Sequence, residues 1–214
     1  MKKLCIYGCG GMGREIADLS EYIDKWNDIV FVDDFYGGKI IDNYIVYNLK
    51  DLISSCSNSE VEFIVATGEP KTRELIYNKL DNLKLNYINI IDSEFRLSKL
   101  SSIKSGTIIH RGVICTVNDH IGKGCLINKH VVIGHDVNIG DFTVISPNST
   151  IGGDVNIGKN CFLGSGSIIR NGITIGDNSI IGMGAVVLKD VAANSVIVGN
   201  PGKLIRKNIS NNIF

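Results

Sequence analysis

The second half of the chain carries an apolar residue at every sixth position. Fifteen consecutive anchors, each an aliphatic residue or a cysteine, keep this register: Ile103, Ile109, Cys115, Ile121, Ile127, Ile133, Ile139, Ile145, Ile151, Ile157, Leu163, Ile169, Ile175, Ile181 and Val187. Glycine often follows the anchor, and glycine lets a backbone turn a tight corner. A period of six fits neither a helix nor alternating hairpins. The pattern predicts triangular coils of eighteen residues, about five in all, in which the anchors stack inside a parallel β-helix.

The first part of the chain alternates short apolar runs with stretches of helical spacing. The runs predict strands and the stretches predict helices: strands at Lys3–Tyr7, Ile29–Val32, Glu62–Ala66 and Tyr87–Ile91, and helices at Gly13–Lys25, Leu49–Ser55 and Lys71–Leu83. Strands joined by helices indicate parallel pairing with right-handed crossovers. We therefore predict a small Rossmann-like α/β domain over residues 1–95, and the β-helix with a short C-terminal segment over residues 96–214.

Composition narrows the possible partners and location. Twenty-two basic side chains balance twenty-two acidic ones, so no net field attracts nucleic acid or an anionic membrane. The six cysteines form no CxxC pair, which suits reduced thiols in the cytosol. No signal segment is apparent, and no run approaches the roughly 18 apolar residues that span a bilayer. We expect a cytoplasmic protein without nucleic acid partners or membrane insertion.

A glycine-rich loop between the first strand and the first helix suggests a phosphate site. Gly8-x-Gly10-x-x-Gly13 brings bare backbone N–H groups and a helix N-terminus together. Asp33 and Asp34 end the next strand, where a carboxylate can accept hydrogen bonds from a ribose or a base. The loop also fits NAD, but the domain supplies only about one mononucleotide-binding half, which suits a nucleoside diphosphate such as UDP better. Alternatively, the glycines only permit a tight turn.

The repeats and the segment that follows them resemble a known superfamily. The hexads and the sequence 196–203 are similar to hexapeptide-repeat acyltransferases. The segments 6–13 and 31–35 resemble one group within it, the sialic acid O-acetyltransferases and bacillosamine-type nucleotide-sugar N-acetyltransferases. The resemblance implies a left-handed β-helix, a homotrimer, acetyl-CoA as co-substrate and a small nucleotide sugar as acceptor. It places these residues against the acceptor: Gly8, Gly10, Gly11, Met12, Gly13, Asp33, Asp34, Gly68 and Asn128.

Acetyl transfer needs a base that removes the proton of the attacking amine or hydroxyl, and hydrogen-bond donors that stabilise the developing oxyanion. Histidine titrates near neutrality, and the chain offers four candidates: His110, His120, His130 and His135. The segment 133–136 resembles the catalytic segment of the group, which assigns the base to His135 and its support to Asp136. A carboxylate beside an imidazole stabilises the charged ring. The alternative is that His135 is an ordinary surface residue at a corner.

The spacing of His130 and His135 also fits a zinc site of the β-helical carbonic anhydrase type. Such a site needs a third histidine from an earlier coil. The positions one and two coils before His130 are Gly112 and Glu94, so no third histidine stacks there. We expect no metal, with a zinc hydro-lyase as an alternative.

The resemblance assigns further roles on the β-helix. Asn128 would orient the acceptor, or would only turn a corner, since asparagine tolerates a left-handed backbone. Val144 stands where relatives often have a second histidine, so oxyanion stabilisation falls to backbone N–H groups, with Gly153 as candidate. Ser165 and Met183 would line the acetyl-CoA groove.

Two departures from the family pattern are visible. Met12 stands where members often carry histidine, which leaves the acceptor sugar open, and Gly202 replaces the usual alanine. The predicted function is transfer of acetyl from acetyl-CoA to the amine of a nucleotide-linked amino sugar, UDP-linked by preference, in surface glycan or glycoprotein synthesis. The alternatives are O-acetylation of sialic acid or another sugar hydroxyl, and a non-catalytic trimeric scaffold.

Overall fold

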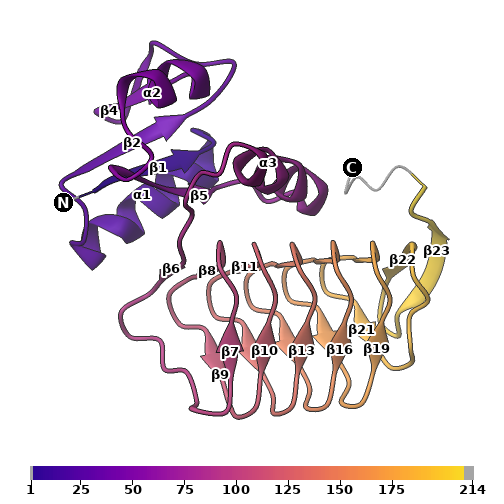
Figure 1. Cartoon of the computed structure of the whole chain (residues 1–214). Coiled ribbons are helices and arrows are strands. Elements are labelled where there is room, and N and C mark those ends of the chain that lie inside the picture. The colour runs from indigo at the N-terminus through magenta and orange to yellow at the C-terminus, as the bar shows by residue number, and fades with distance from the viewer. Residues whose placement is uncertain (1, 210–214) are drawn as a thin grey trace.

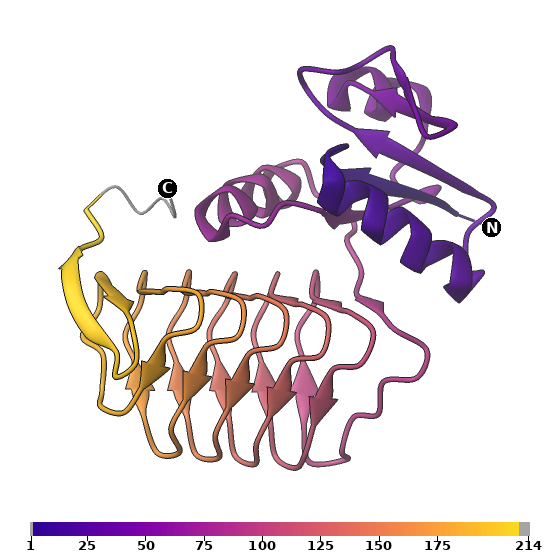
Figure 2. The ribbon, with the colours of Figure 1, turned by 180° about the vertical axis from the view of Figure 1, so that it is seen from behind.

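The computed structural model describes residues 2–209 as a small α/β domain resting on a parallel β-helix (Figure 1). The α/β domain lies over the N-terminal coils, and the view from behind shows α3 extending along the row of coils (Figure 2). Both predicted architectures are confirmed. The left-handed direction of the coils stays a prediction from the resemblance.

The α/β domain is built on a five-stranded sheet of order β3-β4-β2-β1-β5. Its elements are β1 (Lys3–Tyr7), α1 (Gly11–Ile23), β2 (Asp28–Val32), β3 (Ile40–Ile41), β4 (Tyr44–Tyr47), α2 (Leu49–Ser55), β5 (Val61–Val65) and α3 (Pro70–Asn82). The strand β1 pairs in parallel with β2 and β5, and β3 is antiparallel to β4. Sequence reasoning missed the β3–β4 hairpin. Its signal is the pair Asp42 and Asn43, both at positive φ, which suits a two-residue hairpin turn.

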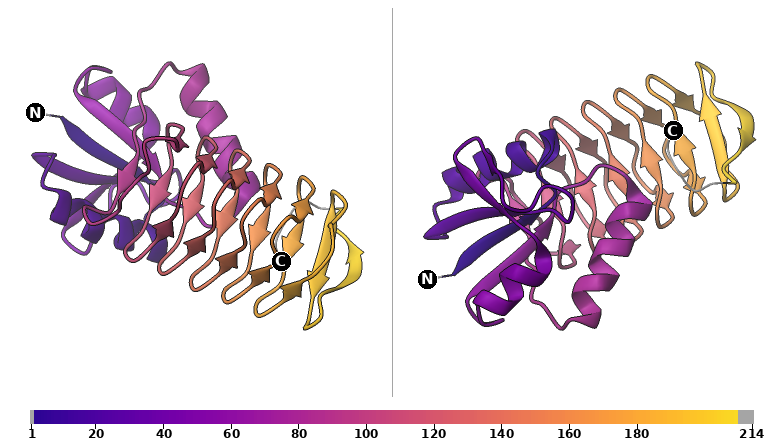
Figure 3. Two further views of the ribbon diagram at one scale, coloured as in Figure 1. Left: turned by 90° about the horizontal axis from the view of Figure 1, so that it is seen from below. Right: turned by 90° about the horizontal axis from the view of Figure 1, so that it is seen from above.

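The β-helix is a triangular prism with one sheet on each of three faces, and all its strand pairs are parallel except the final pair of face 2. Figure 3 shows its coils stacked in one row. Face 1 consists of β7 (Ser102–Ile103), β10 (His120–Ile121), β13 (Asn138–Ile139), β16 (Asn156–Ile157) and β19 (Thr174–Ile175). Face 2 consists of β6 (Ile90–Ile91), β8 (Ile108–Ile109), β11 (Leu126–Ile127), β14 (Val144–Ile145), β17 (Phe162–Leu163), β20 (Ile180–Ile181), β22 (Ser195–Val198) and β23 (Lys203–Lys207). Face 3 consists of β9 (Ile114–Cys115), β12 (Val132–Ile133), β15 (Thr150–Ile151), β18 (Ile168–Ile169) and β21 (Val186–Val187).

The predicted anchors form the interior of this prism. Each of the strands β7 to β21 ends on one anchor, and pairs each residue with the one eighteen positions away, as in Ile127 and Ile145. At most corners a residue adopts positive φ, a conformation suited to glycine, asparagine and aspartate. The strict period of six in the sequence therefore reflects one buried side chain and one corner per hexad.

The predicted strand Tyr87–Ile91 is divided between the two parts of the molecule. Tyr87 forms a parallel bridge with Phe63 in the α/β sheet, whereas β6 pairs with β8 on face 2. The chain thus changes sheets between residues 87 and 90. The domain boundary at residue 95 stays a prediction.

The outward-facing residue of each strand differs between the three faces. On the part of face 2 formed by β8, β11 and β14 these residues are apolar and buried beneath the α/β domain: Ile108, Leu126 and Val144. On face 1 they are polar and exposed: Ser102, His120, Asn138, Asn156 and Thr174. On face 3, Ile114, Val132 and Ile168 are 56%, 38% and 46% exposed, and we call these three residues the apolar stripe. The N-terminal coils of face 2 are thus covered within the chain, whereas face 3 exposes the apolar stripe, with Thr150 between Val132 and Ile168.

A buried arginine joins the α/β domain to the β-helix. Arg73 on α3 is fully buried, and its guanidinium donates to the carbonyls of Val65 and Thr67 at 2.8 Å each. It also donates to Gly124 at 2.8 Å and to Cys125 at 3.3 Å, which belong to the β-helix. The same cation thus satisfies backbone acceptors in both parts.

The variant Arg73→Met is expected to lower the free energy of unfolding by about 3–4 kcal/mol, because four buried carbonyls lose a charged donor. Urea denaturation followed by circular dichroism measures this change. Arg96→Met, which alters an exposed arginine, provides the matched control and should change stability by less than about 0.5 kcal/mol. Equal midpoints for the two variants would contradict a joining role for Arg73.

Candidate active site

His135 and Asp136 lie on the prism edge between face 3 and face 1, and both side chains are exposed. The Nδ1 atom of His135 lies 2.8 Å from Oδ2 of Asp136. Because a carboxylate only accepts hydrogen bonds, Nδ1 is the donor of this pair. The other ring nitrogen, Nε2, is then left to accept a proton.

Asn118 completes this arrangement and was missed by sequence reasoning. It lies one coil before Asp136, and its amide donates to Oδ1 of Asp136 at 2.7 Å. The hydrogen bonds from Asn118 and His135 hold the pKa of Asp136 below its usual value. The carboxylate therefore stays ionised at neutral pH and can stabilise a charged imidazole. The signal was available, because residues eighteen positions apart stack in adjacent coils.

Gly153 lies one coil beyond His135 and packs directly against its ring. A Cβ atom at this position would lie 2.5 Å from His135 Nε2, so a side chain here would displace the ring. Within residues 2–209, the N–H of Gly153 makes no hydrogen bond that would occupy it. Gly153 thus offers a free backbone donor beside the proposed base.

Asn128, Ser165 and Met183 lie on a different edge, between faces 2 and 3. Asn128 is buried, and its side chain accepts from the N–H of Lys129 at 3.0 Å. Met183 is 79% exposed, and the carbonyl of Ser165 accepts from Gly184 at 2.9 Å. One chain therefore does not bring these three residues together with His135.

Val144, the position where relatives often carry a second histidine, is buried on face 2 beneath the α/β domain. Its valine side chain contributes to the apolar contact between the two parts of the molecule. The structure thus gives this residue a packing role.

A cavity of about 570 Å³ opens at the carboxyl ends of β1, β2 and β5. The predicted residues Gly8, Gly10, Asp33 and Asp34 line it, whereas Gly68 follows β5 at the same edge of the sheet. This is the edge at which parallel sheets bind their ligands. Four of the residues predicted to contact the acceptor therefore line one cavity, and Gly68 lies at the same edge of the sheet.

The glycines of the loop divide into two kinds. A Cβ at Gly8, whose φ is +108°, would lie 2.8 Å from the carbonyl of Ala66, and one at Gly13 would lie 2.1 Å from the carbonyl of Gly8. At Gly10 and Gly11 a Cβ would face open space. Tight packing thus accounts for the first two glycines, while Gly10 and Gly11 leave bare backbone open at the start of α1. The first N–H groups of a helix have no partner within it.

The two aspartates of the cavity have different partners. Asp34 accepts hydrogen bonds from Tyr7 and Lys79, both at 2.7 Å. Partial burial raises the pKa of Asp34, but these two hydrogen bonds outweigh it and leave the pKa lowered. Asp33 accepts from the N–H of Phe35 at 2.9 Å, and the thiol of Cys9 lies 3.3 Å from its other oxygen. Both carboxylates are thereby oriented at the cavity.

The remaining predicted residue of the loop, Met12, is partly buried against the core that joins α1, β1 and face 2.

Of the other histidines, His120 lies on face 1 and His130 is exposed on the edge between faces 2 and 3. Over residues 2–209, no group of three or more His, Cys, Asp or Glu side chains is placed to hold a metal ion. In the same range, no helix is both long and apolar enough to cross a membrane.

A small α/β domain followed by a hexapeptide β-helix is the architecture of the hexapeptide-repeat acyltransferases that the comparisons identify. Three family models match the chain: the PglD N-terminal domain over residues 3–80, the bacterial transferase hexapeptide (six repeats) over 120–153, and the hexapeptide repeat of succinyl-transferase over 154–189. Together these models cover most of the chain, which is similar to the PglD-type hexapeptide-repeat acetyltransferases and is an enzyme of the acetyltransferase class.

Solved structures share this fold over nearly the whole chain. The acetyltransferase domain of PglB from Neisseria gonorrhoeae is 26% identical, with a TM-score of 0.89 over 96% of this chain and 100% of that one. WeeI from Acinetobacter baumannii is 25% identical, with a TM-score of 0.88 and the same coverage. A perosamine N-acetyltransferase variant from Caulobacter crescentus is 22% identical, with a TM-score of 0.90 over 97% and 98%. A search of curated protein sequences gave no match.

Proposed function

We propose that this enzyme transfers the acetyl group of acetyl-CoA to the amine of a nucleotide-linked amino sugar, with UDP as the nucleotide, in surface glycan or glycoprotein synthesis. The observation that carries the proposal is the hydrogen bond from His135 Nδ1 to the ionised Asp136, which leaves Nε2 as a base on an exposed edge. The structure of the similar PglB domain has been solved in complex with acetyl coenzyme A. The Caulobacter enzyme was crystallised with CoA and GDP-perosamine, and its likeness here supports the fold.

In the proposed reaction, His135 Nε2 removes a proton from the sugar amine as the amine attacks the thioester carbonyl. Asp136 stabilises the imidazolium that forms. The N–H of Gly153 donates to the oxyanion, since Gly153 packs against the same ring. The imidazolium then returns the proton to the departing CoA thiolate, and the acetylated sugar remains.

The position of His135 favours a site shared between chains. The α/β domain covers face 2, and the edge that carries His135 lies opposite this face. We call the open backbone at Gly10 and Gly11 the phosphate cradle. One chain thus holds this cradle and the proposed base on opposite sides of the prism. A second copy is needed to bring them together.

A homotrimer with the apolar stripe turned toward its axis satisfies this requirement. In a closed ring, the edge of one chain that carries His135 meets the edge of the next that carries Asn128, Ser165 and Met183. At Gly166 and Gly184, on this second edge, a Cβ would meet nothing within 4 Å. The backbone there is open to a thin ligand such as the pantetheine arm of acetyl-CoA. We therefore propose that acetyl-CoA binds between adjacent chains.

The same base would also serve O-acetylation of sialic acid or another sugar hydroxyl. The bare backbone at Gly10 and Gly11 favours a phosphorylated acceptor over a free sugar, because it lies at a helix N-terminus. This feature is the reason to prefer the nucleotide-linked acceptor.

A thiol-release screen tests the proposal. Acetyl-CoA is incubated with UDP-, GDP- and TDP-linked amino sugars and with free sialic acid, and we expect the largest rate with a UDP-linked amino sugar. Gly11→Asp, which places a negative charge in the cradle without a steric clash, is expected to lose that activity. A rate with sialic acid alone would support O-acetylation, and no CoA release from any acceptor would favour a scaffold.

A further inference from the structure

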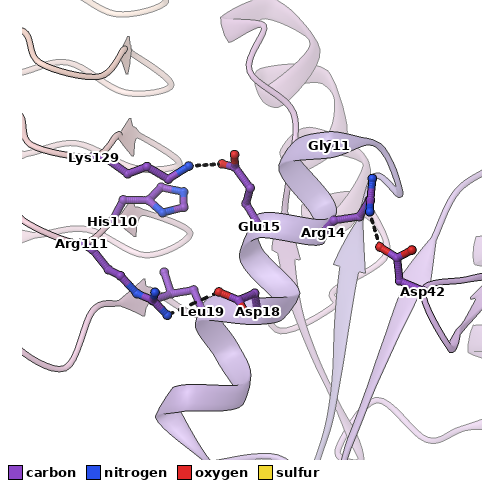
Figure 4. A pocket seen from close by; sticks show the side chains of 9 residues that line it. All are labelled: Gly11, Arg14, Glu15, Asp18, Leu19, Asp42, His110, Arg111 and Lys129. Carbon is purple, nitrogen blue, oxygen red and sulfur yellow. Dashed lines mark hydrogen bonds and ion pairs between the residues drawn. The ribbon is translucent and has the colours of Figure 1, made fainter.

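A second cavity, of about 480 Å³, lies between α1 and the β-helix (Figure 4). Its volume falls within the range of small-ligand sites, about 300–1,000 Å³. The side chains used below are Glu15 and Leu19 from α1, and His110, Arg111 and Lys129 from the edge between faces 2 and 3. Of the residues singled out in the sequence, Gly11 and the candidate base His110 line this cavity, and the proposed reaction does not use His110.

His110 is the least expected residue in its wall. Its side chain is only 2% exposed, and among residues 2–209 its Nε2 atom has no hydrogen-bond partner. Burial lowers the pKa of His110 to about 4, and the nearby cation of Lys129 acts in the same direction. The ring is therefore neutral at neutral pH, with one nitrogen that donates and one that accepts. A buried polar atom without a partner is unusual and indicates a missing partner such as a ligand.

The charges around His110 are balanced. Lys129 Nζ lies 2.6 Å from a carboxylate oxygen of Glu15, and Arg111 lies 3.4 Å from Asp18. Arg14 pairs with Asp42 on the other side of the cavity, as Figure 4 shows. Since each cation in the wall has a carboxylate partner, the cavity provides many polar contacts without net charge. Such a wall suits a neutral hydroxylated ligand better than a phosphate.

Neighbouring residues of the glycine loop line the two cavities. Gly10 lines the nucleotide cavity, and its chain neighbour Gly11 lines the second one. A ligand with its nucleoside in the first cavity and its diphosphate over the bare backbone at Gly10 and Gly11 would extend its sugar toward His110. Leu19 provides an apolar wall there for the C–H groups of a sugar ring.

We propose that the second cavity holds the sugar ring of the acceptor, and that His110 Nε2 hydrogen-bonds a substituent of this ring. The inference rests on the proposed function, because it takes a nucleotide sugar as the acceptor. A sugar hydroxyl both donates and accepts, so it satisfies Nε2 in either tautomer of the neutral ring. His110 is thus a specificity-determining residue that selects the sugar, separate from the proposed base His135.

Binding measurements isolate this role. The dissociation constants of UDP and of a UDP-linked amino sugar are measured by calorimetry, and their ratio gives the contribution of the sugar. The probe is the best acceptor from the thiol-release screen, or UDP-glucosamine if none reacts. In His110→Phe we expect the affinity for the UDP-sugar to fall about tenfold, with UDP affinity unchanged within about twofold, as for the loss of one buried hydrogen bond.

Two further variants make the result specific. His110→Gln, whose amide can reach the position of Nε2, should recover part of the sugar contribution. His120→Phe, on face 1, is the matched control and should bind both probes as the wild type does. Thermal melting confirms that each variant is folded.

The inference is overturned if His110→Phe is folded and keeps the wild-type ratio, or if the wild type binds UDP as tightly as the UDP-sugar. A change of the same size in UDP affinity would also overturn it, because the residue would then act on the nucleotide. Failure of the proposed function is a separate result, since it appears as absence of CoA release from wild-type enzyme while the binding ratio is still measured.

Discussion

Replacement of His135 by alanine is expected to lower kcat by about 10²–10⁴-fold, the usual contribution of a general base. The reason is geometric: the hydrogen bond to Asp136 occupies Nδ1 and leaves Nε2 for the proton of the acceptor. The side chain of His135 is 63% exposed and packs only against a glycine and Asp136 among the contacts described above, so the fold and the oligomer should persist. Steady-state CoA release, together with light scattering, measures both.

Two further variants test whether the effect is specific to His135. Asp136→Asn keeps a side chain that can accept a hydrogen bond but removes the charge, so kcat should fall less than in His135→Ala. His130→Asn keeps a residue that tolerates positive φ at an exposed position and should retain the wild-type rate. If His135→Ala retained more than about a tenth of the wild-type rate, His135 would not be the general base.

A charge in the apolar stripe is expected to separate the proposed trimer into monomers. Ile168 is 46% exposed in the single chain, and in the trimer it would be buried against two other copies. Ile168→Asp would place a charge in that apolar contact, which is highly unfavourable without a partner. Size-exclusion chromatography with light scattering should show a third of the wild-type mass, and CoA release should be lost. Asn156→Asp on face 1 is the control and should remain a trimer.

Mixing two inactive variants tests whether the site is shared between chains. Gly11→Asp lacks the cradle and His135→Ala lacks the base. The two variants are co-expressed in equal amounts. If a site takes its cradle from one chain and its base from the next, each part is intact with a probability of one half. About a quarter of the sites are then complete, so about a quarter of the activity returns. A site within one chain would recover no activity.

The fold could be predicted in detail because its signals are redundant. Fifteen anchors in one register leave no freedom in the placement of β7 to β21. The segments Lys3–Tyr7 and Leu49–Ser55 also have the predicted boundaries, because each is a continuous apolar or amphipathic run. The β3–β4 hairpin was missed because β3 has only two residues, too few to form a periodic pattern.

The candidate site could be predicted only where a local motif marks it. The glycine loop and the His135–Asp136 pair are such motifs: the structure shows open backbone at the loop and a hydrogen bond within the pair, while their roles stay predictions. Arg73 and His110 could not be found in this way, because the burial of a polar side chain depends on contacts between segments far apart in the chain. Asn118 is an intermediate case, since the eighteen-residue repeat points to it once Asp136 is chosen.

The stacking of the coils fixes distances along the β-helix in regular steps. Each coil advances the prism by one strand spacing, about 4.8 Å, so a side chain that moves along an edge moves in whole steps of that length. The α/β domain is fixed to particular coils by Arg73, through its bonds to Gly124 and Cys125. The offset between cradle and base along the prism axis is therefore quantised. Gain or loss of one coil between them would change the distance along the axis from the cradle to the base by about one strand spacing. The residues at the edge and their chemistry would stay the same.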